Sequence, residues 1–515
     1  MRLSTLLDAI PANLAPTRES REALTANPLI RGVSYDSRSV APGDLFVALP
    51  GSNRDGHDYL DEAAHLGAVA MLVEDLPGSR SGFDVPLVAV PDSRRALAPV
   101  SAEFFGQPSR ELKLVGVTGT NGKTSTSYLI ESILAQAGLQ VGLIGTVECR
   151  YAGEHVRAVN TTPESLDLQR MLRAMCTRNI EAVVMEVSSH GLELGRVHGC
   201  NFSVAAFTNL TQDHLDFHGS MVAYRRSKLR LFEEHLEPGA TAVVNSDDPA
   251  SEEICRAAQS VGARILRTSC RGNGSADIRL LEARCEVDGS HARLALPSGP
   301  LEVDFPLLGE FNLENLLVAC GVAEALGVDA EQIQGGIAKC PQVPGRVERV
   351  GRNLSDCPTV IVDYAHTPDA IDKLLRALRP LTEGHLITLF GCGGDRDRSK
   401  RPQMAQAVAR WSDRVVATSD NPRTEDASGI LDDVEAGLRD LERVSGFEPD
   451  GPLGCYTVRV DRREGIALAL ESARKEDMVV LAGKGHEDYQ IIGHEHFPFD
   501  DRDEAMRCLT QRGES

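Results

Sequence analysis

The sequence has no apolar run long enough to cross a membrane as a helix. Its one N-terminal apolar stretch is short and is interrupted by Asp8 and Pro11, so we expect no signal peptide. The chain also has no internal repeat and no low-complexity tract. These absences exclude a membrane-inserted protein, and we expect the protein to work in the cytoplasm.

Closely spaced cysteines and excess positive charge are missing as well. None of the twelve cysteines forms a C-x-x-C pair, which argues against a zinc or redox motif and favours reduced, mostly buried thiols. The formal net charge is −21, and an acidic surface repels nucleic acids and anionic membranes. If the ligand is a phosphate, its positive contacts must come from a few local lysine and arginine side chains.

The composition that remains is typical of a large globular protein. Hydrophobic residues make up 42% of the 515 residues and charged residues 25%, which is enough to bury more than one core. The length favours two to four domains. Alternating strand-like and helix-like segments predict an α/β architecture. We divide the chain into a small N-terminal α/β domain (1–107), a central parallel-sheet domain with a phosphate loop (108–346) and a C-terminal Rossmann-like domain (347–515).

One stretch organises the chain: a strand at 113–117, a glycine-containing loop at 118–124 and an apolar-periodic helix after it. Backbone N–H groups of such a loop bind phosphate oxygens, helped by the helix dipole. We expect Lys123 to reach the terminal phosphates and the Thr124 hydroxyl to bind Mg²⁺. The usual pattern G-x-x-x-x-G-K-[ST] lacks its first glycine, since Val117 stands there. The alternative is a chance glycine loop, which the flanking strand and helix argue against.

Polar residues follow two further strands of the central domain. Glu186 lies near the end of the buried strand 182–187, where a second Mg²⁺ ligand belongs in a phosphate-loop enzyme. His214 and Asp216 follow the strand 204–208. A solitary histidine is usually structural, but the carboxyl ends of parallel strands meet at one sheet edge. We therefore favour a functional role for this cluster.

Other polar residues receive a structural interpretation from the sequence. Lys228 lies in a predicted helix among arginines, and such a lysine is ordinarily solvated. Asn312 precedes the apolar helix 316–326 and is expected to cap it. In the N-terminal domain, Asp36 and Ser37 are interpreted as turn formers.

Four predicted strands of the C-terminal domain each end in a cluster of glycines and polar or charged residues. Such clusters describe one open sheet with a ligand crevice at its edge. Because a second phosphate loop is missing, we expect this domain to bind a co-substrate and to close over the nucleotide. The clusters lie at 363–366, 391–397, 420–423 and 483–487.

With these motifs, the chain resembles the Mur ligases, the ATP-dependent amide ligases of peptidoglycan precursor synthesis, over all three domains. The resemblance explains the missing glycine, because that family has the same phosphate loop. It implies an enzyme that adds meso-diaminopimelate to UDP-N-acetylmuramoyl-L-alanyl-D-glutamate through an acyl phosphate. Such an enzyme serves cell-wall biogenesis, and with it cell shape, cell division and the cell cycle. The matching segments are 118–124, 160–163, 186–191, 393–397 and, above all, 420–423.

The resemblance also implies the site residues. ATP is expected to contact Gly119, Thr120, Asn121, Gly122, Lys123, Thr124, Ser125, Asn315, Arg346 and Asp363. The UDP-linked dipeptide is expected to contact Tyr35, Ser37, Ser52, Asn53, Arg54, Asn160, Thr161, Thr162, Ser188, Leu194 and Arg196. Diaminopimelate is expected to contact Arg396, Asp420, Asn421, Pro422, Arg423, Gly483 and Glu487. The expected Mg²⁺ ligands are Thr124, Glu186, His214 and Lys228, and the expected catalytic residues are Lys123, Glu186, His214 and Lys228.

Two of these implications carry a condition. Lys228 would act as a carbamate, which replaces its positive charge with a carboxylate-like anion suited to Mg²⁺. Leu194 stands where the family commonly has glutamine, so one polar substrate contact is expected to be missing. We expect small-molecule substrates only, no nucleic acid, no membrane insertion and a monomer.

Arg423 is the predicted selector of the amino-acid substrate. Diaminopimelate carries a distal carboxylate that lysine lacks, and a planar guanidinium binds a carboxylate with two parallel hydrogen bonds. Three alternatives are a phosphate-loop switch protein, a sister ligase that adds lysine and a folate polyglutamate ligase. The second open sheet argues against the first, the segment 420–423 against the second and the segment 160–163 against the third.

Overall fold

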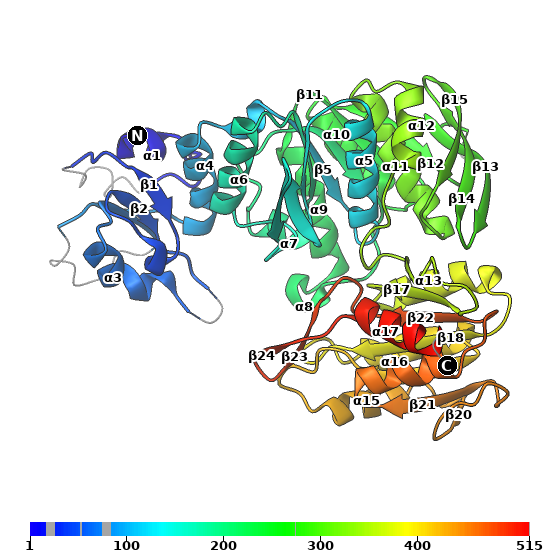
Figure 1. The fold of residues 1–515 in the computed structure, drawn as a ribbon. Coiled ribbons are helices and arrows are strands. Elements are labelled where there is room, and N and C mark those ends of the chain that lie inside the picture. The colour runs from blue at the N-terminus through cyan, green and yellow to red at the C-terminus, as the bar shows by residue number, and fades with distance from the viewer. Residues whose placement is uncertain (17–25, 52–53, 75–83, 273, 514–515) are drawn as a thin grey trace.

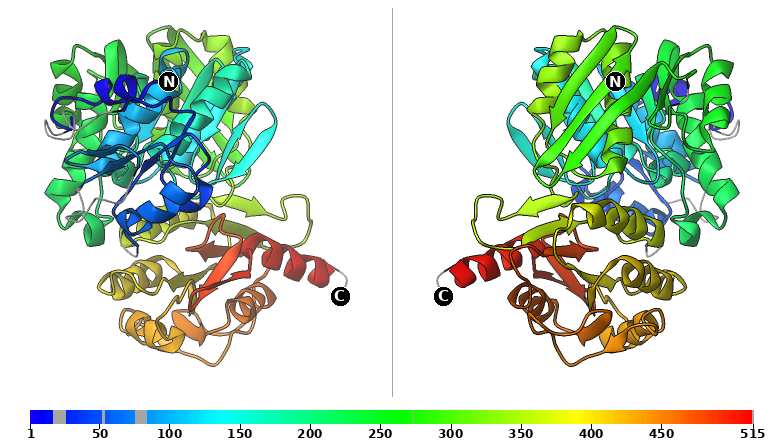
Figure 2. Two further views of the ribbon diagram at one scale, coloured as in Figure 1. Left: turned by 90° about the vertical axis from the view of Figure 1, so that its left-hand side faces the viewer. Right: turned by 90° about the vertical axis from the view of Figure 1, so that its right-hand side faces the viewer.

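The computed structural model describes residues 1–515 except 17–25, 52–53, 75–83, 273 and 514–515. Three main sheets follow one another along the chain, each with its own helices (Figure 1). The N-terminal domain lies to one side of the central domain, and the C-terminal domain lies below both in the two views of Figure 2. The predicted three-domain α/β architecture is confirmed.

The N-terminal domain is a parallel sheet of four strands in the order β1-β2-β3-β4. Apolar side chains from the helices α1 and α4 fill the core on one face of this sheet. Leu166 of helix α6 belongs to the same core, so α4 and α6 join this domain to the central one. The elements are α1 (Leu3–Asp8), β1 (Gly32–Ser34), β2 (Asp44–Val47), α3 (Leu60–His65), β3 (Ala70–Val73), β4 (Leu87–Ala89) and α4 (Ser93–Phe104).

The central domain is built on an eleven-stranded sheet in the order β15-β14-β13-β12-β11-β10-β5-β9-β6-β7-β8. The strands from β12 to β6 are parallel, as predicted. Antiparallel strands extend both ends of the sheet, β14 and β15 at one and β7 and β8 at the other; the sequence did not predict them. The strands are β5 (Lys113–Thr118), β6 (Val141–Ile144), β7 (Glu148–Tyr151), β8 (Glu154–Arg157), β9 (Ala182–Glu186), β10 (Phe202–Phe207), β11 (Leu236–Asn245), β12 (Arg264–Ser269), β13 (Ile278–Glu286), β14 (Gly289–Leu296) and β15 (Gly299–Phe305).

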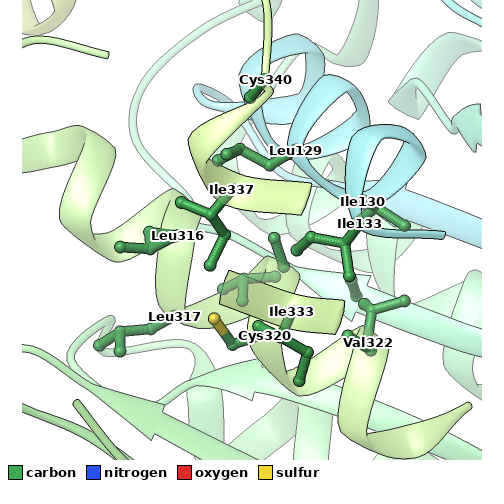
Figure 3. Packing of buried hydrophobic residues seen from close by; sticks show 14 of the residues in the cluster. Leu129, Ile130, Ile133, Leu316, Leu317, Cys320, Val322, Ile333, Ile337 and Cys340 are labelled. Carbon is green, nitrogen blue, oxygen red and sulfur yellow. The ribbon is translucent and has the colours of Figure 1, made fainter. Parts of the chain in front are cut away.

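Helices cover both faces of this sheet and form a core with each. On one face, α5, α11 and α12 pack together through side chains such as Ile133, Leu316 and Ile337 (Figure 3). Each such buried aliphatic side chain contributes about 1.5–3 kcal/mol, which fixes α5 and the loop that precedes it. The helices are α5 (Lys123–Gln136), α6 (Ser165–Thr177), α7 (Ser189–Glu193), α8 (Leu215–His218), α9 (Met221–Glu234), α10 (Ser251–Ser260), α11 (Glu310–Ala325) and α12 (Ala330–Ala338).

The start of α11 differs from the prediction. Its N-cap residue is Gly309, and Asn312 lies inside the first turn, so the expected cap was wrong. The amide of Asn312 instead donates to the Leu308 carbonyl (2.7 Å), and its oxygen accepts from Asn315 (2.8 Å). Asn312 therefore orients Asn315.

The C-terminal domain has a seven-stranded sheet in the order β16-β17-β22-β18-β19-β21-β20, parallel except for β16. The four predicted strands are the neighbours β17, β22, β18 and β19, so their polar carboxyl ends share one edge. The elements are β16 (Glu348–Val350), β17 (Thr359–Asp363), α13 (Pro368–Leu378), β18 (Leu386–Cys392), α14 (Lys400–Trp411), β19 (Arg414–Ser419), α15 (Ala427–Glu435), β20 (Glu442–Arg443), β21 (Cys455–Arg459), α16 (Arg462–Glu471), β22 (Met478–Ala482), β23 (Tyr489–Ile492), β24 (Glu495–Pro498) and α17 (Asp501–Gly513).

Two general features of the chain follow from this structure. All twelve cysteines lie among the described residues and are free thiols, and none of them is exposed. Over the same residues, no helix combines the length and the apolar character that a membrane span requires.

Candidate active site

The predicted phosphate loop follows β5, a strand in the interior of the central sheet, and leads into α5. Gly122 has a left-handed backbone (φ +84°), and a Cβ atom there would lie 2.2 Å from Asn315 Oδ1. The Lys123 ammonium donates to the carbonyls of Gly119 (3.0 Å) and Thr120 (2.9 Å). Lysine and the N-terminus of a fourteen-residue helix thus meet at one concave loop, the arrangement that binds phosphate groups.

The charge of Lys123 is held in a protein interior. Burial lowers its pKa, while the nearby carboxylates of Glu186 and Asp213 act in the opposite direction. A bound polyphosphate would supply further negative charge and restore the preference for the ammonium form.

Oxygen atoms gather around Glu186 at the carboxyl end of β9. Its Oε2 accepts hydrogen bonds from the hydroxyls of Thr124 (3.1 Å) and Thr146 (2.9 Å), and its Oε1 accepts from the Thr146 backbone (2.8 Å). A carboxylate beside a hydroxyl is the hard oxygen donor set that Mg²⁺ prefers, so these residues fit that ion.

His214 reaches the same region from the loop after β10. It has a left-handed backbone (φ +52°), which is uncommon for a residue other than glycine and often marks a functional site. Burial lowers the pKa of its ring to about 4, so the imidazole is neutral at physiological pH and can offer a lone pair. Its Nε2 lies 3.4 Å from Oδ2 of Asp213.

Lys228 contradicts the expectation of a solvated side chain. It is 2% exposed, and its Nζ donates to the Gly119 carbonyl (2.7 Å) in the phosphate loop. Burial, and then the neighbouring Lys123, lower its pKa well below the ordinary value. Lys228 lies on the buried face of α9 with residues such as Tyr224, whereas Arg226 is exposed, a distinction that residue types alone did not reveal.

A cavity of about 1040 Å³ opens in front of the phosphate loop. Of the predicted nucleotide residues outside the loop, Asn315, Arg346 and Asp363 all line it. Arg346 donates to Thr124 Oγ1 (3.4 Å), and both carboxylate oxygens of Asp363 accept backbone N–H groups. The linker between the central and C-terminal domains thus contributes to the cavity wall.

The residues predicted for the UDP-linked substrate divide into two groups. Thr161 and Ser188 line the cavity at the phosphate loop, and Thr161 Oγ1 lies 3.0 Å from Thr146 Oγ1. Thr162 lies beside them and accepts from the backbone N–H of Ser188 (2.9 Å), and Arg196 donates to the Thr162 carbonyl (3.1 Å). Asn160 is exposed, and Leu194 is half-buried at the end of α7.

The second group lies in the N-terminal domain. Tyr35 donates to Asp167 of α6 (2.6 Å), and Ser37 donates to Glu62 (2.7 Å). Arg54 is exposed, whereas Ser52 and Asn53 lie outside the described residues. Asp36 accepts from the Arg38 backbone and caps a short 3₁₀ turn, which agrees with its interpretation as a turn former.

A second cavity, of about 570 Å³, lies at the carboxyl ends of the C-terminal strands. Its wall includes every residue predicted for diaminopimelate except Pro422, namely Arg396, Asp420, Asn421, Arg423, Gly483 and Glu487. The amide of Asn421 donates to Glu487 (2.8 Å). Lys484, which the sequence did not single out, is fully buried and lies 3.2 Å from Glu487 and 3.8 Å from Asp420.

Arg423 faces this cavity with a guanidinium that, among the described residues, forms no ion pair with a carboxylate. Its Nη1 donates to the Gly394 carbonyl (2.9 Å). The backbone of Arg423 is left-handed (φ +52°), and its N–H donates to Ile491 of β23 (3.0 Å). The hairpin β23–β24 therefore helps to fix the backbone of Arg423.

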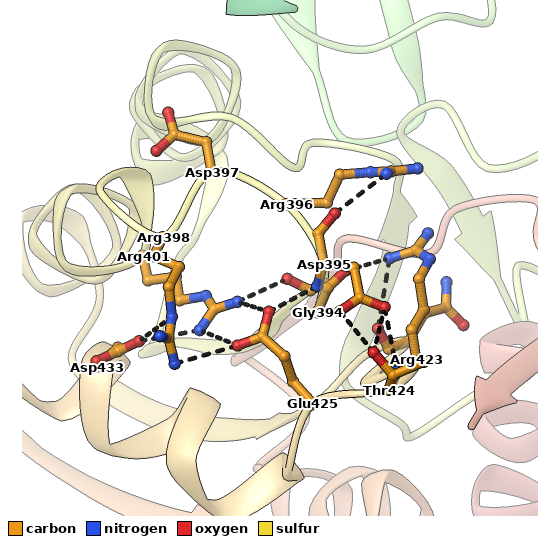
Figure 4. Close-up of polar contacts among 12 residues, drawn as sticks. Gly394, Asp395, Arg396, Asp397, Arg398, Arg401, Arg423, Thr424, Glu425 and Asp433 are labelled. Carbon is orange, nitrogen blue, oxygen red and sulfur yellow. Dashed lines mark hydrogen bonds and ion pairs between the residues drawn. The ribbon is translucent and has the colours of Figure 1, made fainter. Parts of the chain in front are cut away.

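A hydrogen-bond network around the buried Arg401 fixes the conformation of the loop that carries Arg396 (Figure 4). Arg401 is 1% exposed and donates to Glu425 (2.7 Å), Asp433 (2.9 Å) and the Gly393 carbonyl (3.3 Å). Because Glu425 also accepts the backbone N–H of Asp395, the network joins the 393–397 loop to the segment after Arg423.

The two cavities meet. Both are lined by Asp213 and His214 of the central domain and by Tyr364, His366 and Thr367 of the C-terminal domain. Asp216 and His190 line only the second cavity. The phosphate loop and the cluster around Arg423 therefore face one connected space, across which a group activated at one end can be reached from the other.

Some residues of this space were missed at the level of sequence. Asp213 directly precedes His214 in the sequence. Its position in the wall of both cavities depends on a turn that residue type does not reveal. Arg401 and Lys484 read as ordinary helix and loop cations. Only their burial among carboxylates distinguishes them.

Comparison with known families places the chain clearly. The family model described as "Mur ligase middle domain" matches residues 117–323, and "Mur ligase, glutamate ligase domain" matches 345–485. A third, "Mur ligase family, catalytic domain", matches 29–105. Together these matches extend over most of the chain.

Individual proteins agree with the family matches. A UDP-N-acetylmuramoyl-L-alanyl-D-glutamate–2,6-diaminopimelate ligase of Geobacter metallireducens is 44% identical, with 94% of this chain and 96% of that protein covered. A solved structure of an enzyme with the same name is 34% identical, with 94% and 96% covered and a TM-score of 0.67. The MurF ligase of Thermotoga maritima in complex with ADP shares the fold, at 19% identity, 94% and 99% coverage and a TM-score of 0.65.

Proposed function

The chain belongs to the Mur ligase family, and from that premise we propose that it joins diaminopimelate to UDP-N-acetylmuramoyl-L-alanyl-D-glutamate at the expense of ATP. The observation that best supports this proposal is the connected space between the phosphate loop and the cluster around Arg423. An amide ligase needs a phosphoryl donor site, an acid site and an amine site that open onto one another, and this space offers room for all three.

The proposed first step transfers the γ-phosphoryl group of ATP to the free carboxylate of the D-glutamyl residue. A carboxylate oxygen attacks phosphorus, the bond to the bridging oxygen breaks, and ADP leaves. Two anions approach each other in this step, so Lys123 and the N–H groups of the loop must offset their repulsion. Thr161 and Ser188 lie beside Glu186 at the loop and are the residues proposed to hold the acid in line.

We further propose that Mg²⁺ is held by Thr124, Glu186, His214 and a carbamate on Lys228. The ion would neutralise charge on the phosphates when bound. Support comes from the oxygen cluster at Glu186, from the neutral ring of His214 and from the buried amine of Lys228. An uncharged amine can add to CO₂ and release one proton to solvent, and the resulting carbamate anion would relieve the cost of burying a second lysine beside Lys123.

In the proposed second step, the amine of diaminopimelate attacks the acyl carbonyl and phosphate leaves. Arg423 would bind the distal carboxylate of the amino acid through two parallel hydrogen bonds. Each end of diaminopimelate also carries an ammonium group, which suits the carboxylates of Asp420 and Glu487 and the amide oxygen of Asn421. The ammonium that reacts must lose its proton before it attacks. A substrate without the distal carboxylate would leave the guanidinium of Arg423 without a partner, which is the proposed basis of selection against lysine.

The rest of the UDP-linked substrate would extend toward the N-terminal domain. Tyr35 and Ser37 are proposed to contact the uridine nucleotide, with Ser52, Asn53 and Arg54 beside them. Arg196 is proposed to contact the dipeptide, while Leu194 replaces one polar contact by an apolar one. We also propose that the enzyme acts as a monomer in the cytoplasm, where ATP is available and free thiols remain reduced.

The proposal is tested by phosphate release with defined substrates. Phosphate should appear only when ATP, the UDP-linked dipeptide and diaminopimelate are all present, and the mass of the product should equal dipeptide plus diaminopimelate minus water. Equal turnover with lysine would assign the chain to a sister activity. Phosphate release without any amino acid would show a nucleotide hydrolase instead.

A further inference from the structure

A cluster of two histidines and a glutamate lies away from both cavities, where α9 ends. One ring nitrogen each of His198 and His235 and one carboxylate oxygen of Glu234 all lie within 4.8 Å of one another. His235 directly follows α9, and His198 lies in the connection between α7 and β10. The cluster thus brings together two segments that are more than thirty residues apart in sequence.

Each histidine has a ring nitrogen that could bind a ligand. His235 is 5% exposed, and its Nε2 is buried without a hydrogen-bond partner among the described residues. Nε2 of His198 lies 3.7 Å from Oε2 of Glu234, so this ring nitrogen faces the cluster. A buried polar atom without a partner is unfavourable, so Nε2 of His235 favours the binding of a ligand in this cluster.

The donor set distinguishes among ions. Two imidazole nitrogens and one carboxylate oxygen suit Zn²⁺, whereas Mg²⁺ prefers oxygen ligands throughout. Three protein ligands leave the fourth position of a tetrahedral ion for water, and Glu234 on the surface offers a path of entry. Ligands of a tetrahedral zinc ion stand about 3.3–3.5 Å apart. Oε2 of Glu234 lies 3.7 Å from Nε2 of His198, so this pair is already near that spacing.

Two arginines lie near the cluster. One of them, Arg230, pairs with Glu234, so a metal ion would compete with it for that carboxylate. Arg230 lies 4.0 Å from Glu234 and 3.5 Å from Glu193, so it has an alternative acidic partner when Glu234 turns toward a metal. Arg95 of α4 donates to the Glu193 carbonyl (3.5 Å) and brings the N-terminal domain to the same place.

We propose that His198, Glu234 and His235 form a second metal site, selective for Zn²⁺ over Mg²⁺. A bound ion would tie the end of α9 to the connection that follows α7. That connection carries Arg196, proposed to contact the substrate, and it packs against α4 of the N-terminal domain through Gly199. The site would therefore stiffen the junction between the N-terminal and central domains without entering the reaction.

The test is metal binding to the full-length chain after treatment with a chelator. Zn²⁺ is titrated against a zinc-sensitive dye in millimolar Mg²⁺, and unfolding temperature is measured with and without the ion. We expect one Zn²⁺ per chain and a higher unfolding temperature. Loss of even an outer partner of a metal ligand lowers affinity about 10–100-fold, so His198→Gln and Glu234→Gln should each weaken binding at least about tenfold.

His291→Gln serves as the matched control, because His291 also faces a carboxylate (Asp304, 2.8 Å) but lies on β14, outside the cluster. This variant should bind Zn²⁺ as the unchanged chain does. The proposal is overturned if the unchanged chain binds no Zn²⁺ in excess Mg²⁺. It is equally overturned if both cluster variants bind as tightly as the control, since the ion would then sit on other groups.

Discussion

At the scale of single residues, two cations divide the proposed chemistry between them. Lys123 faces carbonyls of the phosphate loop, and Arg423 faces the second cavity from the opposite domain. In the proposed mechanism, the first acts on the phosphoryl group of ATP and the second on the distal carboxylate that distinguishes diaminopimelate from lysine. Their substitutions should therefore fail in different ways.

Lys123→Ala should reduce turnover by about a thousandfold or more, because a positive charge at the phosphoryl group is lost from a buried site. The protein should remain folded by circular dichroism. The control is Lys113→Ala, which removes an exposed lysine at the start of β5 and should leave the rate unchanged. Near-normal turnover of Lys123→Ala would refute the assignment of the phosphate loop.

Arg423→Lys should lower kcat/KM for diaminopimelate on the order of 100-fold, because an ammonium cannot replace the two parallel hydrogen bonds of a guanidinium. KM for ATP should stay the same. Arg410→Lys, an equivalent change on the outer side of α14 where Arg410 pairs with Asp372, is the control. If diaminopimelate use survived the Arg423 change intact, Arg423 would not be the selector.

At the residue scale, the sequence predicted the local structure where a motif fixes its own geometry. The phosphate loop is such a case, because Gly122 and Lys123 belong to one continuous turn into a helix. Lys228 is the opposite case: its contact with Gly119 joins segments 109 positions apart, and nothing around it in the sequence distinguishes it from Arg225 or Arg226. The family resemblance singled it out, and the residue pattern alone favoured solvent.

At the scale of secondary-structure elements, close packing of α5 against α12 holds the phosphate loop in place. A Cβ atom at Gly336 would lie 2.4 Å from the Cα of Ile133, so these helices touch backbone to backbone. Its neighbour Gly335 faces the end of the Gln136 side chain instead, which can move aside.

This difference predicts opposite results for two alanine substitutions in one helix. Gly336→Ala should lower the free energy of unfolding by about 1–3 kcal/mol, because the backbones must separate. Gly335→Ala should be neutral or stabilise by up to about 1 kcal/mol, since alanine favours the helix and the obstacle is flexible. Urea unfolding measures both; equal effects would contradict the packing described for α5 and α12.

Prediction of elements was best for the buried parallel strands and poorest at the sheet ends. Runs such as 182–185 and 478–482 are apolar throughout and have few alternatives. The strands β14 and β15 alternate buried and exposed residues, and β13, β14 and β15 form antiparallel pairs. These strands therefore do not fit the strand-helix alternation from which the rest was inferred. At the start of α11, Gly309 took the cap position expected for Asn312, because a glycine can adopt the required backbone there.

At the scale of the whole molecule, the C-terminal domain meets the central domain around His486. Burial lowers the pKa of His486 to about 3, helped by the charges of Arg346 and Arg502, while the backbone of Thr146 in the central domain acts in the opposite direction. The folded ring therefore resists protonation, whereas in the unfolded chain it takes up a proton near pH 6.5.

Stability should consequently fall as pH drops below about 6.5, because the unfolded state binds the proton that the folded state refuses. Between pH 6.5 and 4.5 this one group accounts for about 2 kcal/mol. His486→Gln should flatten the pH dependence of the free energy of unfolding by that amount. Urea titrations at the two pH values measure this dependence. If the free energy of unfolding of the variant changed with pH as much as that of the unchanged chain, His486 would titrate normally.

The arrangement of whole domains was only partly accessible from sequence. Three sheets and their order along the chain could be predicted, since the strands of each sheet come from one continuous segment of the sequence. The meeting of the two cavities at Asp213, His214 and Tyr364 depends on how the linker after Arg346 turns, and no local pattern encodes that turn.

Transfer of oxygen from acid to phosphate tests the proposed activation step most directly. The UDP-linked dipeptide is prepared with ¹⁸O in the free carboxylate of its D-glutamyl residue and is turned over with ATP and diaminopimelate. If a glutamyl acyl phosphate forms, each inorganic phosphate released carries one labelled oxygen. Phosphate that is free of label while the amide product accumulates would contradict that route.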